Sequence, residues 1–156
     1  MRRTGALTIA LLMVVAAVAA WLVEAMLVLS GRAAVVPSVA LGPALVVLAV
    51  ALLLVAWPVR QAARGRRRID DRHATSVLGF AKASSHVGAI LAGAALGGLA
   101  FFASRAVVVG ETMLALAVAA AGALVQLAAG LIAEHWCVLP PDDDDAVPQG
   151  SAPDPA

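Results

Sequence analysis

The chain has 156 residues, of which 62% are hydrophobic and 13% charged, and its formal net charge is +1. Ordinary soluble domains carry roughly 25% charged residues, so this composition excludes such a domain and indicates a membrane protein. The single cysteine, Cys137, excludes an internal disulfide and a cysteine-rich metal site.

Apolar runs follow one another along the chain at residues 6–29, 39–59, 77–102 and 112–133. Each run reaches about 20 residues, the length that a helix needs to cross the hydrocarbon core of a bilayer. The sequence therefore predicts an all-α fold, an integral membrane bundle of four transmembrane helices within residues 1–139.

The first run also imitates a cleavable secretory signal, because Arg2 and Arg3 precede it and Ala17-Val18-Ala19 resembles a cleavage site. Apolar residues continue well beyond that site to Leu29. The apolar region of a signal normally stops near about 15 residues, so we interpret this run as an uncleaved membrane anchor.

Helix-breaking and interfacial residues support these boundaries. Ser30-Gly31-Arg32 is expected to end the first helix, and Pro37-Ser38 to start the second. Trp57 lies at the end of the second run and Trp136 just after the fourth. Both positions fall on the same predicted side, at the membrane boundary where indole rings prefer to lie.

Basic residues are distributed unevenly over the ends of the runs. Eight of the eleven precede the first run or lie between the second and the third, namely Arg2, Arg3, Arg60, Arg64, Arg66, Arg67, Arg68 and Arg72. The other two links contain only Arg32 and Arg105. Because cytoplasmic links are enriched in arginine and lysine, we expect a multi-pass protein of the plasma (inner) membrane with both termini in the cytoplasm.

The arginine-rich link predicts a lipid partner. It lies directly beside the bilayer, so the anionic inner leaflet is its nearest partner, each arginine contributing about 1 kcal/mol. The residues expected to make this contact are Arg60, Arg64, Arg66, Arg67 and Arg68. Nucleic acid is not an expected partner.

Small residues recur every fourth position in the third run, at Ser85, Ala89, Gly93 and Gly97. Such a flat face lets helix backbones approach closely, which in lipid provides the dispersion contacts that hold helices together. The stripe predicts packing either inside the chain's own bundle or in the seam of a homodimer.

Polar side chains in the third and fourth runs could meet at one depth. Lys82 and His86 share a face of one helix, and Gln126 and Glu134 share a face of the next, antiparallel helix. These residues could form a polar cluster that acts as structural glue or as a binding site. Alternatively, Lys82 could extend its ammonium to the head groups.

Glu24 is the other acid within an apolar run, about six residues from the outer end of the first helix. Its carboxyl group could be protonated, or Arg32 or Arg105 in the outer links could reach down to it. A buried acid here loosely resembles that of small proton-coupled multidrug transporters, but no aromatic set accompanies Glu24.

The C-terminal residues 140–156 are rich in Pro, Gly, Ser and Ala and contain an acidic run at Asp142–Asp145. This composition cannot bury enough apolar surface to fold, so we expect a disordered cytoplasmic tail. The aspartates could attract divalent ions, but a disordered segment gives poor coordination geometry.

Several stretches together resemble an actinobacterial membrane family catalogued as domain of unknown function 3180. They are residues 21–24, 30–32, 56–60, 81–85 and 134–142, and the most specific pieces are Ala-Lys-Ala-Ser and Cys-x-Leu-Pro-Pro-Asp. Val138 stands where we expect a basic residue in relatives. The resemblance implies a four-span inner-membrane protein and no known activity.

No catalytic, cofactor-binding or metal-binding residues are predicted. His73, His86 and His135 have no cysteine or carboxylate arranged with them as a nucleophile relay or metal site. We therefore expect an accessory or scaffold subunit of a cell-envelope assembly that acts by associating with a membrane-protein partner or with itself. A small proton-coupled transporter is the alternative, and an enzyme acting on a lipid carrier is the third reading.

Overall fold

The computed structural model describes residues 5–63, 71–105 and 110–137. Its helices are α1 (Ala6–Leu29), α2 (Leu41–Ala63), α3 (Asp71–Ala103) and α4 (Gly110–Cys137). All four are long and apolar enough to cross a membrane, which confirms the predicted all-α class with four transmembrane helices. The expected tail at 140–156 and the expected lipid contacts of Arg64, Arg66, Arg67 and Arg68 lie outside the described residues.

The helices begin and end at different residues from the apolar runs. α2 starts at Leu41 rather than at the predicted residue 39, because Ser38 occupies a turn before it. The Ser38 carbonyl accepts the N–H of Leu41 at 2.9 Å, and the Ser38 hydroxyl accepts the N–H of Ala40 at 3.3 Å. α3 and α4 extend beyond the predicted 77–102 and 112–133, since hydropathy marks only the apolar part of a helix and the helix can continue past it.

α1 ends in a Schellman motif at Gly31. The N–H of Arg32 donates to the carbonyl of Leu27 at 2.9 Å, and the N–H of Gly31 donates to that of Val28 at 3.1 Å. Gly31 has a φ of 70°, a left-handed conformation that a residue without Cβ adopts readily. The motif satisfies the last carbonyls of α1 and turns the chain back toward the bundle.

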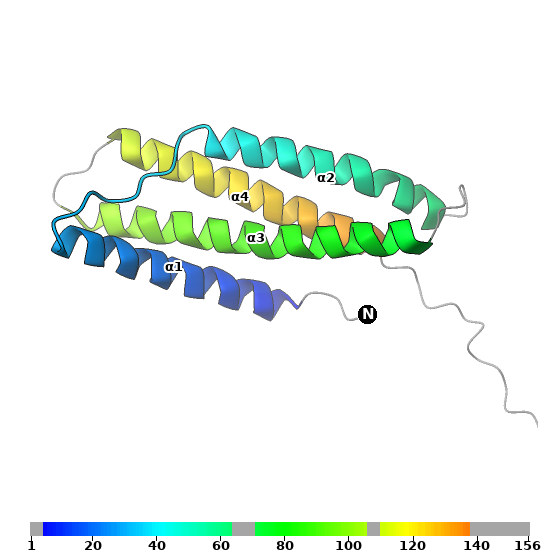
Figure 1. Ribbon diagram of the computed structural model, residues 1–156, viewed down its shortest axis with the longest axis horizontal. Helices are drawn as coiled ribbons and strands as arrows, with labels where there is room; N and C mark the ends of the chain where they lie inside the picture. The colour runs from blue at the N-terminus through cyan, green and yellow to red at the C-terminus, as the bar shows by residue number, and fades with distance from the viewer. Residues whose placement is uncertain (1–4, 64–70, 106–109, 138–156) are drawn as a thin grey trace, which may run out of the picture.

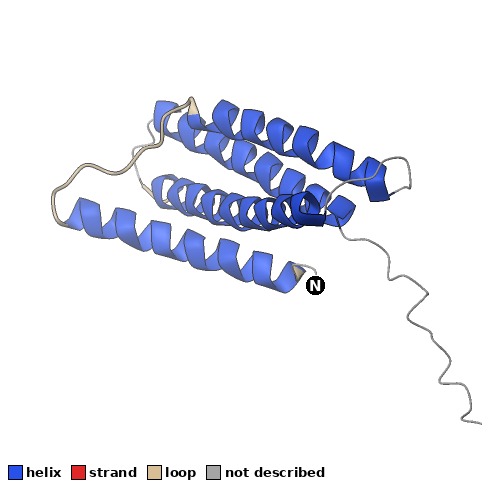
Figure 2. Cartoon of the chain, turned by 45° about the vertical axis from the view of Figure 1, so that its right-hand side comes forward, coloured by secondary structure: helices blue, strands red, loops and turns tan. Residues whose placement is uncertain are grey.

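The helices are arranged in the order α1, α3, α4, α2 across the molecule (Figure 1). α3 and α4 form the central antiparallel pair, α1 packs on α3, and α2 packs chiefly on α4. Among the described residues, no Cα atom of α1 lies within 8 Å of one in α2. Figure 2 shows α1 along one edge, with the 30–40 connection running from its end to α2. The bundle is therefore open between its first two helices.

Glycines set the close approach of the helices. A Cβ on Gly122 of α4 would lie 2.7 Å from the Cα of Gly42 in α2, and one on Gly130 would lie 2.7 Å from the backbone nitrogen of Ser85 in α3. Such distances leave no room for a side chain, so the backbones themselves are in contact. In lipid, where apolar side chains gain nothing by leaving solvent, this backbone packing is what holds helices together.

The predicted small-residue stripe of α3 is covered inside the chain. Ser85 meets α4 at Gly130, and Ala89 packs with Ile9 of α1 and Leu127 of α4. Gly93 and Gly97 lie against the backbone of α1, where an added Cβ would collide with the carbonyl groups of Met13 and Ala17. A homodimer seam on this face would first have to displace α1.

Candidate functional site

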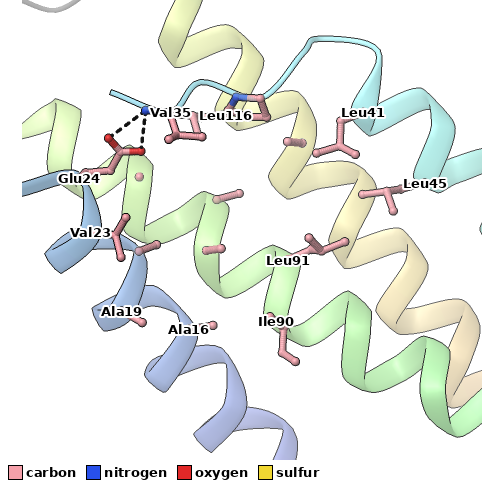
Figure 3. Close-up of a pocket in the computed structure, with 16 residues that line it drawn as sticks. Ala16, Ala19, Val23, Glu24, Val35, Leu41, Leu45, Ile90, Leu91 and Leu116 are labelled. Carbon is pink, nitrogen blue, oxygen red and sulfur yellow. Dashed lines mark hydrogen bonds between the residues drawn. The ribbon is translucent and has the colours of Figure 1, made fainter. Parts of the chain in front are cut away.

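A cavity of about 460 Å³ lies in the opening between α1 and α2, above the α3–α4 pair (Figure 3). Its walls come from all four helices and its end from the 30–40 connection, where Val35 and Pro37 contribute. Apart from Glu24, every lining side chain is apolar or absent. The cavity exists because α1 packs on α3 instead of closing onto α2.

Glu24 is the polar group of this cavity, and its side chain is only 6% exposed. The chain reversal at Gly31 brings Val35 back over α1, and the N–H of Val35 donates to both carboxylate oxygens of Glu24 at 3.2 Å (Figure 3). A backbone amide of the following connection therefore binds the acid that sequence analysis singled out.

Arg32 and Arg105 were one alternative for a partner of Glu24, and in the described part of the chain neither forms a hydrogen bond or ion pair with it. The guanidinium carbon of Arg105 lies 4.5 Å from the ring centre of Phe101. Arg32 follows the Schellman turn and is exposed. The turn that ends α1 brings a backbone donor to Glu24 instead, the N–H of Val35.

Glu24 retains hydrogen-bonding capacity. A carboxylate offers about four lone-pair sites, and one N–H shared between two oxygens satisfies few of them. A carboxylate taken out of water is costly unless it is paired or hydrogen-bonded. The arrangement therefore favours a bound group that donates hydrogen bonds or carries positive charge.

The predicted polar cluster of α3 and α4 is only partly brought together. The side-chain amide nitrogen of Gln126 donates to the hydroxyl of Ser84, and Gln126 is 4% exposed. Nδ1 of His86 lies 2.7 Å from the carbonyl oxygen of Lys82, in its own helix. Gln126 therefore reaches α3 through Ser84, which the sequence analysis did not assign to the cluster, rather than through Lys82 or His86.

Glu134 lies on the same face of α4 and is buried, with 4% of its surface exposed. Gly130 contacts Ser85, and Ala133 belongs to the same buried cluster as Ala81, which places this part of α4 beside the start of the buried stretch of α3. Lys82 is thus at the depth of Glu134, as the antiparallel register requires. The energetic coupling of Lys82 with Glu134 stays a prediction.

An arginine and two tryptophans meet at the same end of the bundle. The guanidinium carbon of Arg60 lies 5.6 Å from the ring centre of Trp57 and 4.6 Å from that of Trp136. The indole rings themselves are 5.9 Å apart and nearly perpendicular. The sequence predicts both tryptophans at one membrane boundary but not this contact, which joins the ends of α2 and α4.

The described residues contain no group of three or more His, Cys, Asp or Glu side chains that could hold a metal ion. The site that the geometry defines is instead an apolar, laterally open cavity with one buried acid. Four apolar helices carrying such a cavity define the class of the protein, a small multi-pass helical membrane protein.

The chain belongs to the family described as protein of unknown function (DUF3180), whose family model matches residues 9–141. This match confirms the resemblance to that family. Comparison with curated proteins and comparison with solved structures found no match.

Proposed function

We propose that the protein is an accessory or scaffold subunit of a cell-envelope assembly and that it acts through association within the plasma membrane. The observation that carries this proposal is the exposed position of α1. In its apolar window 6% of residues are buried, compared with 56% in α4. In the described part of the chain, the backbone contacts of α1 are with α3, so most of its surface is available for contacts with another membrane protein.

Site-specific photocrosslinking in native membranes tests this proposal. The crosslinker is placed on α1 at Val15 or Val18, whose side chains are 58% and 54% exposed. Matched controls carry it on α4 at Leu124 or Val125, which are 42% and 46% exposed. We expect α1 to yield a defined protein adduct that also copurifies stoichiometrically. Identical products from both helices, or lipid adducts alone, would refute a partner-binding role for α1.

The scaffold proposal includes an orientation with both termini in the cytoplasm. It is supported by the distribution of the arginines and by the position of Arg60 between two interfacial tryptophans. Reporter fusions after Arg68 and Asp145 should read cytoplasmic, and fusions after Arg32 and Gly110 should read external. A cytoplasmic reading at Arg32 would contradict the orientation.

One observation favours a second candidate, a small proton-coupled transporter. Glu24 is a buried carboxyl group on a cavity, and acids within membrane helices often relay protons or bind substrates. Purified protein in liposomes distinguishes the two proposals. A transporter dissipates a proton gradient when substrate is added and loses that activity in Glu24→Gln, whereas a scaffold subunit leaves the gradient intact.

A further inference from the structure

We infer that the cavity between α1 and α2 binds one hydrocarbon chain of a phospholipid whose head group carries a primary ammonium, with that ammonium at Glu24. This binding site goes beyond the scaffold proposal and does not depend on it. The size, the depth and the polar group of the cavity support this assignment.

The volume of the cavity suits a single hydrocarbon chain rather than a transmembrane helix. A transmembrane helix about 10 Å across and about 30 Å long occupies on the order of 2,400 Å³. The cavity holds about 460 Å³, which is within the range of about 300–1,000 Å³ typical of ligand sites. A partner helix is therefore too large for it, while one flexible hydrocarbon chain is not.

The depth matches one leaflet of the membrane. The α1 wall of the cavity extends from Glu24 to Ala16, which is about 12 Å along a helix. Half of the hydrocarbon core is about 15 Å. Glu24 lies about 8 Å inside the end of α1 at Leu29, so a hydrocarbon chain whose head-group ammonium lies at Glu24 would reach the region of the midplane, between Leu45 of α2 and Ile90 of α3 (Figure 3).

The opening between α1 and α2 lets a lipid enter from the side. No Cα atoms of these helices come within 8 Å of each other in the described residues. A two-chain lipid can therefore place one chain in the cavity and leave the other in the bilayer. The walls that would receive the chain are apolar apart from Glu24, so the chain meets no other polar group.

The charge of Glu24 selects the head group. The carboxylate is buried, and its one bound donor in the described residues is the N–H of Val35. A primary ammonium supplies three donors and a compensating charge, whereas a quaternary ammonium supplies no N–H. The exposed residues Arg32 and Arg105 follow the ends of α1 and α3 at the same end of the bundle, where they can attract the phosphate of such a head group.

Native mass spectrometry of the purified full-length protein tests this inference. The protein is titrated separately with phosphatidylethanolamine, phosphatidylcholine and phosphatidylglycerol of identical acyl chains. We expect one phosphatidylethanolamine per chain, bound about tenfold more tightly than phosphatidylcholine, the factor expected of a charge-assisted hydrogen bond. Glu24→Gln should remove that preference, so that the two lipids bind with similar affinity.

Two further variants keep the test decisive if Glu24→Gln fails to fold. Ala94→Leu fills the cavity from a half-buried position on its wall, and Ala128→Leu adds the same bulk at an exposed position of α4 outside it. We expect Ala94→Leu to bind phosphatidylethanolamine at least tenfold more weakly and Ala128→Leu to bind it as tightly as the unaltered protein. Equal binding of the three lipids by the unaltered protein would overturn the inference, and so would undiminished binding in Ala94→Leu. If the unaltered protein were a dimer and Ala94→Leu a monomer, a second copy of the chain would be the occupant of the cavity. That result would also overturn the inference.

Discussion

Replacing Gly97 with alanine tests whether the α1–α3 seam is a contact between backbones. The added Cβ would collide with the carbonyl group of Ala17 in α1. A backbone atom cannot rotate away as the end of a side chain can, so α1 itself must move. At Gly79, on the same helix, an added Cβ would have no atom of the described residues within 4 Å apart from its own helical turn, and Gly79→Ala is therefore the matched control.

The difference in stability between Gly97→Ala and Gly79→Ala measures the cost of overpacking at the α1–α3 seam. Both substitutions replace glycine by the best helix former and gain about 1 kcal/mol of propensity. Only Gly97→Ala also suffers overpacking, which costs about 1–3 kcal/mol. We therefore expect the free energy of unfolding of Gly97→Ala to be lower than that of Gly79→Ala by about 1–3 kcal/mol.

Thermal unfolding in detergent measures this difference. At about 2–4 °C per kcal/mol for a chain of this length, the two alanine variants should differ in Tm by about 2–12 °C. Gly97→Leu should lower the Tm further, whereas Leu96→Ala, which trims a side chain that is 42% exposed, should lower it little. Equal Tm values for Gly97→Ala and Gly79→Ala would refute the close seam.

Two more predictions concern the opposite end of the bundle. The first is a double-mutant cycle with Lys82→Met and Glu134→Gln. The double variant should lose about 1 kcal/mol less stability than the sum of the two single variants, because each single variant leaves the other charge uncompensated. Strict additivity of the losses would mean that Lys82 extends to the head groups. Arg60→Gln should lower the free energy of unfolding by about 1 kcal/mol, because it removes the contacts of the guanidinium with the indole rings. The control Arg32→Gln, at an exposed position, should lower it little. Equal losses of stability would contradict a stabilising cation–π contact.

The four helices could be predicted from the sequence because a bilayer requires every backbone group to be satisfied within a helix. Length and hydropathy then locate the spans. Helix ends were less accurate: α2 starts at Leu41 and α4 continues to Cys137. At these positions the polar interface permits either helix or turn, and local hydrogen bonds such as those of Ser38 decide.

The candidate site could be predicted only in part. Glu24 stood out because acids are rare within membrane helices, but its partner is the backbone N–H of Val35, and any residue except proline offers such a donor. Likewise, the side-chain amide of Gln126 donates a hydrogen bond to Ser84 of α3, rather than contacting Lys82 or His86 of the same helix. That choice depends on the rotation of α3 against α4, which close contacts such as Gly130 on Ser85 determine and which residue spacing within one helix cannot reveal.

The cavity itself follows from which helices pair, a property of the whole bundle. Gly93 and Gly97 fit α1 closely onto α3, and Gly42 with Gly122 fit α2 closely onto α4. These two seams hold α1 and α2 to opposite sides of the central pair, so the space between them stays open. Among the described residues the close backbone contacts of α1 are with α3, so its movement away from α2 would leave the backbone contacts of α3 with α4 and of α2 with α4 intact. We therefore expect the width of the opening to depend on the α1–α3 seam, so that substitutions at Gly97 should alter lipid binding at Glu24 as well as stability.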